Sequence, residues 1–281
     1  FTKYTLLILP DSVSLEGTLL EKVNAYLAQG GRLIASHQSL LKPDGSDFAI
    51  DFPATIDGQS GFNPDYLLPE AGWGEDLVAS PFVVYEKSMR LKPSDGGRSH
   101  AAVHDPYFNR TWKHFCSHQH APARPEPSGY SGIVATDRVA YFAHPIFKAF
   151  ERSGQPLIKF AFRGALKRLL SEPLLKSNLP SAARATVNRQ SQKKRHLLHV
   201  FYAQTQLRGS GLPGWRGEQA MEILEDSIPL HDVNLSIRLE KAPAAIRSAY
   251  SEKPVEFHYA DGRANITLDK VDLHELLVIE E

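Results

Sequence analysis

The densest group of side chains able to do chemistry lies between residues 105 and 120. Three imidazoles and the only thiol of the chain fall within seven residues: His114, Cys116, His118 and His120. Imidazole and thiolate are ligands that suit zinc, and side chains two apart in an extended segment point to the same side. A metal site is therefore one interpretation, for which His100 and His104 are the nearest further imidazoles.

The thiol could instead be a nucleophile. A catalytic cysteine needs a base and an oxyanion hole. Doubly wound hydrolases that use cysteine hold it on a tight strand-to-helix turn with flanking glycines. Cys116 lies between Phe115 and Ser117, with no glycine nearby, which argues against this interpretation.

A third interpretation is a binding loop. The segment offers four aromatic faces: Tyr107, Phe108, Trp112 and Phe115. Aromatic faces beside polar donors are suited to a sugar or a protein partner. The candidate substrate-binding residues are Arg110, Trp112, His114, His118 and His120. A structural loop that packs its own aromatics and satisfies its own histidines is the remaining alternative.

Other polar residues give no catalytic assignment. A glycosidase needs two facing carboxylates roughly 5–9 Å apart. Glu225 and Asp226 are neighbours, and neighbours in a strand point to opposite faces, so they cannot act as a pair. The segment after residue 9 lacks the G-x-G-x-x-G pattern of dinucleotide sites. We therefore assign no catalytic residue and no metal ligand, and we expect no cofactor.

Composition narrows the function classes. The chain has 281 residues, enough for one large or two ordinary domains, and its 32 basic and 32 acidic residues balance. Nothing in this balance favours nucleic acid or a membrane surface, and no apolar run of about 18 residues is present. We expect neither partner. A single cysteine excludes an intramolecular disulfide.

The first elements read as a βαβ unit. Residues 4–9 form a continuous apolar run typical of a buried parallel strand, residues 15–27 follow helical spacing, and residues 32–35 form the next strand. This unit predicts a doubly wound, flavodoxin-like α/β sheet. Because a buried strand stands at residue 4 with no initiator Met, we expect an excised piece of a longer protein.

The middle of the chain is less regular. Residues 42–80 are rich in Gly, Pro and Asp and predict an irregular insertion, and residues 105–130 predict a long loop. Further strands are expected at 81–91, 101–104, 132–135 and 139–143, and helices at 146–153 and 157–170. These elements complete a predicted α/β domain over residues 1–175.

After a boundary at 173–180 the hydrophobic pattern changes to period two. Strands are expected at 195–202, 233–239, 255–259, 264–268 and 273–279. Asp261-Gly262, between two of these runs, is a strong hairpin signal. Short alternating strands predict a small antiparallel β-sandwich domain over residues 181–281.

Several segments resemble a known family. Residues 4–13 (Tyr-Thr-Leu-Leu-Ile-Leu-Pro-Asp-Ser-Val) and 25–34 resemble the start of the trimerisation domain of bacterial β-galactosidases, which is similar to a class I glutamine amidotransferase without its nucleophile. Residues 105–118, 139–147, 195–199 and 225–233 are similar to a branch described as α-L-fucosidase or β-galactosidase-like. The resemblance covers nearly the whole chain.

The resemblance implies a non-catalytic C-terminal part of a glycoside hydrolase. In such enzymes an N-terminal (β/α)8 barrel carries both catalytic carboxylates, the amidotransferase-like domain builds the trimer, and a small β domain closes the chain. It implies a homo-oligomer, a trimer, and a carbohydrate substrate for the whole enzyme, in the cytoplasm or periplasm of a bacterium. We expect residues 107–120 to complete the sugar site of a neighbouring subunit. A stand-alone Cys116 hydrolase and a carbohydrate-binding protein without catalysis are the competing readings.

Overall fold

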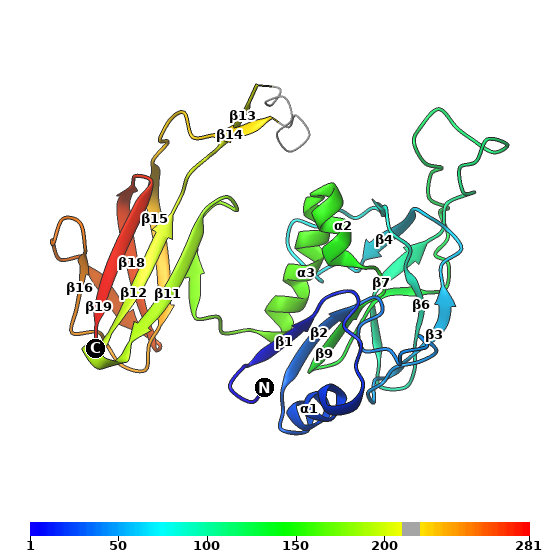
Figure 1. Ribbon diagram of the computed structural model, residues 1–281, viewed down its shortest axis with the longest axis horizontal. Helices are drawn as coiled ribbons and strands as arrows, with labels where there is room; N and C mark the ends of the chain where they lie inside the picture. Colours follow the sequence, from blue (N-terminus) through cyan, green and yellow to red (C-terminus); the bar gives the residue numbers. More distant parts are fainter. Residues whose placement is uncertain (210–219) are drawn as a thin grey trace. The chain divides into compact units, whose positions relative to one another are not determined.

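The computed structural model describes residues 1–209 and 220–281, which form two compact units, Phe1–Ser171 and Glu172–Glu281. Figure 1 shows both units. The described residues contain three α-helices, all in the first unit. The strands of the described residues form one nine-stranded sheet and three smaller sheets. No helix among the described residues is long and apolar enough to cross a membrane.

The first unit opens with the expected βαβ arrangement. Strand β1 (Leu6–Leu9) pairs in parallel with β2 (Arg32–Ser36), and helix α1 (Gly17–Ala28) connects them. Gly30, just after the helix, has φ of 88°, the left-handed conformation that a helix C-terminus often needs. Strand β9 (Val139–Phe142) continues the parallel pairing on the other side of β2.

Beyond β9 the sheet is antiparallel, in the order β1-β2-β9-β8-β7-β4-β5, with β6 beside β8 and β3 beside β6. These strands are β3 (Ala54–Gln59), β4 (Asp65–Pro69), β5 (Phe82–Val84), β6 (Met89–Pro93), β7 (Arg98–His104) and β8 (Ser131–Ala135). Only residues 136–138 separate β8 from β9, too few for a parallel crossover. The unit is thus mixed α/β with a curled sheet that is parallel only over β1, β2 and β9, and the doubly wound, flavodoxin-like arrangement predicted from the sequence is not confirmed.

Two local expectations were wrong. Residues 42–80 are not wholly irregular, because β3 and β4 lie there; their short apolar runs are hidden among Gly and Pro, and Gly58 marks a register shift within β3. Residues 81–91 are not one strand but β5 and the start of β6. The break between these strands carries Tyr85, Glu86 and Ser88, three residues that matter for the site below.

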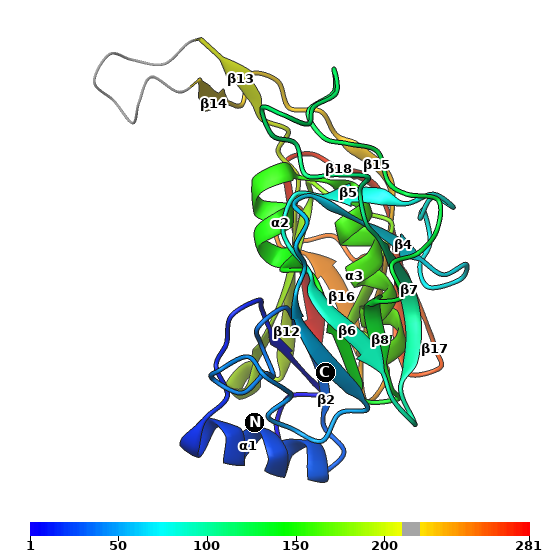
Figure 2. The ribbon, with the colours of Figure 1, turned by 90° about the vertical axis from the view of Figure 1, so that its right-hand side faces the viewer.

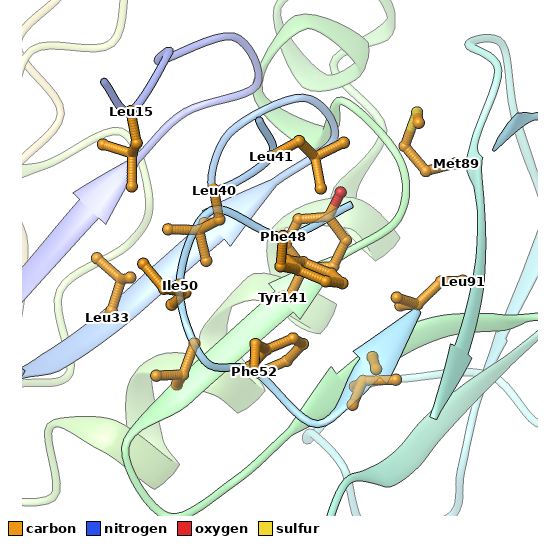
Figure 3. Packing of buried hydrophobic residues seen from close by; sticks show 14 of the residues in the cluster. Leu15, Leu33, Leu40, Leu41, Phe48, Ile50, Phe52, Met89, Leu91 and Tyr141 are labelled. Carbon is orange, nitrogen blue, oxygen red and sulfur yellow. The ribbon is translucent and has the colours of Figure 1, made fainter. Parts of the chain in front are cut away.

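Helices cover both faces of the parallel strands (Figure 2). Along β2, Leu33 and Ala35 join the core beneath α1, whereas Ile34 joins the core beneath α2 (Ile146–Ser153) and α3 (Pro156–Leu169). Successive strand side chains point to opposite faces, which accounts for this division. In the α1-side core, Phe48 and Tyr141 pack edge to face, 5.0 Å between ring centroids (Figure 3).

The second unit is an antiparallel sandwich, as its period-two pattern predicted. Its sheets run β10-β15-β18-β17 and β11-β12-β19-β16 around one apolar core. Asp261 and Gly262, both with positive φ, form the two-residue turn between β17 and β18. The strands are β10 (Leu175–Ser177), β11 (Arg184–Gln190), β12 (Arg195–Phe201), β15 (Leu230–Arg238), β16 (Ala245–Ser248), β17 (Phe257–Ala260), β18 (Arg263–Val271) and β19 (His274–Glu280). Strands β13 (Gln206–Arg208) and β14 (Met221–Ile223) pair as a separate two-stranded antiparallel sheet.

Candidate functional site

The connection between β7 and β8 is a long loop, residues 105–130, that extends away from the sheet (Figure 1). Its base is closed by an isolated antiparallel bridge between Pro106 and Ala123. The backbone N–H of Arg124 donates to the carbonyl of Asp105 at 2.9 Å, and the guanidinium of Arg90 pairs with the Asp105 carboxylate at 2.8 Å. The loop therefore leaves the sheet at a fixed point.

Two further contacts hold the loop above its base. The Asn109 side chain accepts a hydrogen bond from the backbone N–H of Asn63 at 3.0 Å and donates to the carbonyl of Gly61 at 2.7 Å. The Tyr85 hydroxyl hydrogen-bonds Nδ1 of His120 at 3.0 Å. Contacts therefore fix the loop at Asn109 on its outgoing side and at His120 on its returning side. Residues 110–119 lie between these two points.

An open depression of about 850 Å³ lies between this loop and helix α2. Ligand pockets in proteins commonly have volumes of about 300–1,000 Å³. Three aromatic side chains line it: Tyr85, Trp112 and Phe115. The remaining lining residues are Asn63, Pro64, Glu86, Arg110, Thr111, Gln119, Ala149, Arg152 and Ser153. Aromatic faces and polar groups therefore share one concave surface.

Glu86 is the charged centre of this pocket. Its carboxylate, only 11% exposed, accepts from Nζ of Lys148 at 3.0 Å and pairs with the guanidinium of Arg152 at 2.5 Å. Burial opposes ionisation of Glu86, but the hydrogen bonds from these two cations outweigh it and leave the Glu86 pKa below its usual value. The carboxylate is therefore ionised at neutral pH and fixes both cations of α2 beside the pocket.

A buried polar contact supports the pocket walls. The Asp65 carboxylate, fully buried, contacts Nε2 of His144, which is also fully buried, and accepts a hydrogen bond from the Ser88 hydroxyl at 2.6 Å. Asp65 follows Pro64, Ser88 lies two residues after Glu86, and His144 lies two residues before α2. This triad therefore joins the three segments that form the pocket walls opposite the loop.

The predicted site residues separate into two groups. Arg110 and Trp112 line the pocket, and Trp112 is 83% exposed. His114, His118 and His120 do not line it. His114 and His118 are exposed, whereas His120 packs edge-on against Tyr66 and Tyr85, and burial and the nearby His118 lower the pKa of its imidazole.

The imidazoles and the thiol do not converge. No group of three or more His, Cys, Asp or Glu side chains that could hold a metal is found in residues 1–209 and 220–281. Cys116 Sγ contacts the carbonyl oxygens of His118 and His120 at 3.5 and 3.3 Å, rather than an imidazole nitrogen. His100 is instead held by Glu70, 2.6 Å from its Nδ1, so neither the metal nor the nucleophile interpretation gains support.

Comparisons with known proteins show which enzymes the chain is similar to. No protein-family profile and no curated protein matches the chain. Among solved structures, α-L-fucosidase isoenzyme 2 from Paenibacillus thiaminolyticus is 32% identical over 99% of this chain, with a TM-score of 0.90. A cold-adapted β-galactosidase from Rahnella sp. R3 is similar in fold, at 10% identity over 97% of this chain and a TM-score of 0.51.

The chain has a glycoside hydrolase-like fold, but it covers only 41% of the length of the fucosidase chain and 32% of the galactosidase chain. Sequence reasoning placed the aromatic loop and missed the opposite wall of the pocket, including Glu86 and Arg152 and the triad beneath them. One signal was available: Asp65 and His144 are polar residues flanking the apolar segments of β4 and β9, where a buried polar residue needs a partner.

Proposed function

We propose that this chain is a non-catalytic part of a glycoside hydrolase of the α-L-fucosidase or β-galactosidase type. The observation that carries the proposal is the 32% identity to the fucosidase over 99% of this chain, matched to 41% of that protein. In this reading the catalytic carboxylates belong to the part of the enzyme outside the chain. This would agree with the absence of a recognisable carboxylate pair in the sequence.

The proposed role of the chain is assembly. The first unit would serve as the amidotransferase-like trimerisation domain and the second as the small β domain that follows it. Residues 107–120, with Trp112 at an exposed position of the loop, would complete the sugar site of a neighbouring subunit. A carbohydrate-binding protein without catalysis is the second candidate, supported by the aromatic lining of the pocket.

The solution mass of the 281-residue chain tests the assembly role. Light scattering after size exclusion should give three times the 31.3 kDa of one chain. A mass that stays at one chain over the accessible concentration range would contradict assembly by this chain. Binding of sugar by such a monomer would favour the second candidate.

A further inference from the structure

The loop above the pocket carries an unusual charge pattern. Between Asp105 and Glu126, the two carboxylates of the loop, the chain carries Arg110, Lys113 and Arg124 and no further Asp or Glu, although acidic and basic residues balance over the whole chain. Arg124 is used internally, since its guanidinium donates to the carbonyls of Pro106 and Tyr107. Arg110 lies at the pocket itself. The loop therefore presents positive charge to whatever occupies the depression.

Helix α2 adds to this charge from the opposite side. Lys148 and Arg152 both face Glu86, which is the one carboxylate among the described residues lining the pocket. Among the described residues that line the pocket, two cations, Arg110 and Arg152, thus stand against one anion, an excess of one positive charge. An excess of this kind lowers the energy of an anion bound between the loop and the helix.

The cations are also arranged for directional contact. Arg152 pairs with Glu86 through Nη1, and a guanidinium has five N–H donors, so donors remain for a second acceptor. Guanidinium groups recognise planar and tetrahedral oxyanions by paired hydrogen bonds. Tyr85, Trp112 and Phe115 supply apolar faces on the same surface, which suit the C–H face of a sugar ring.

We propose that this pocket binds an anionic saccharide, a sugar that carries a carboxylate or a sulfate group. Arg110 and Arg152 contact the anionic group, and the aromatic side chains contact the ring. The choice of a saccharide rests on the proposed function, whereas the choice of an anion rests on the charges of the pocket alone.

Binding to the 281-residue chain tests the proposal directly. The probes are methyl glucuronide and glucose 6-sulfate, compared with neutral methyl glucoside and with inorganic sulfate, by calorimetry or ligand-observed NMR. At least one charged sugar should bind about tenfold more tightly than methyl glucoside, the difference expected for one charged hydrogen bond. The better of the two identifies the anionic group, and its affinity should fall as salt is raised.

Variants locate the site. Arg110→Gln and Arg152→Gln should each weaken binding of the charged sugar about tenfold. The matched control is Lys167→Gln on α3. It also removes one positive charge, from an exposed ion pair with Glu75, and should leave the affinity for the charged sugar unchanged. A loss of affinity equal to that in the two arginine variants would mean that net charge alone governs binding, and it would overturn the site.

Other outcomes of these binding experiments also support or overturn the proposal. Equal affinity for methyl glucoside and both charged sugars overturns the anionic specificity. Inorganic sulfate or a poly-glutamate peptide that binds as tightly as the charged sugars overturns the saccharide and indicates a general polyanion or acidic-protein surface. A trimeric chain that binds no charged sugar overturns this proposal and leaves the assembly role standing. A monomeric chain that binds one supports this proposal and contradicts assembly.

Discussion

At the scale of single residues, Glu86 connects the chemistry of the pocket to the stability of the fold. Its carboxylate is largely buried and receives hydrogen bonds from two cations of α2, Lys148 and Arg152. These partners lie 62 and 66 residues away in the sequence. The pocket therefore depends on the ion pairs of Glu86 with Lys148 and Arg152. These ion pairs form only when α2 packs beside the end of β5.

This contact predicts a pH dependence. Because the Glu86 pKa is depressed from 4.5 in the folded chain, its contribution is fully present above pH 4.5 and is lost as the pH falls through the lower, folded-state pKa. Glu86→Gln should cost about 2 kcal/mol of unfolding free energy at pH 7 and progressively less in acid. Urea unfolding from pH 7 to pH 3 measures the difference.

Glu75→Gln is the matched control for this experiment. Glu75 also pairs with a cation, Lys167, but its side chain is 71% exposed, so solvent screens the contact and its removal should change the unfolding free energy little at any pH. Stability curves for wild type and Glu86→Gln that run parallel from pH 7 to pH 3 would show that the ion pair does not contribute in the way described.

At the scale of elements, local patterns predicted more than long-range contacts. The βαβ opening, both later helices and the Asp261-Gly262 hairpin follow from periodicity and turn chemistry within a few residues. Strands β3 and β4 were not predicted, because short apolar runs among Gly and Pro carry little periodicity. The loop of the site could be predicted from its composition, whereas the Asp65–His144 contact could not, since 79 residues separate its members.

This contact predicts a stability defect that involves three elements. Asp65→Asn keeps the side-chain volume but replaces the carboxylate that contacts His144 with an amide, in a place with no exposure for either side chain. Breaking a buried pair from one side costs about 3–5 kcal/mol, and we expect a loss of unfolding free energy in this range. Chemical denaturation measures it, and hydrogen exchange should show the largest increases in β4, residues 85–88 and the start of α2.

The control for Asp65 is Asp57→Asn. Asp57 is 60% exposed and contacts Lys92 at 3.4 Å and the Tyr130 hydroxyl at 2.8 Å. Because solvent screens these contacts, replacing Asp57 should change the unfolding free energy little. If both variants were destabilised equally, the buried triad would have no special part in joining the pocket walls.

At the scale of the whole molecule, a neutral chain places strongly exposed aromatic side chains and a small net positive charge on one loop. Trp112 and Phe115 are 83% and 69% exposed, although the base of their loop is fastened to the sheet at several points. Water is a poor environment for the apolar faces of these two side chains, and the fastened base holds them in a defined place. This combination suits a loop that meets another surface, which in the proposed assembly is a neighbouring subunit.

Subunit mixing in a full-length glycosidase containing this chain would test that arrangement. One variant carries Trp112→Ala, which should lower kcat/KM about tenfold through loss of stacking. The other lacks a catalytic carboxylate outside this chain and is inactive. In mixed oligomers, a subunit with intact carboxylates receives Trp112 from its inactive neighbour, so activity should rise above that of the separate proteins.

Tyr250→Ala, which removes another exposed aromatic side chain, is the control and should leave activity unchanged. If oligomers verified as mixed by mass spectrometry gain no activity, the loop acts within its own subunit or not at all.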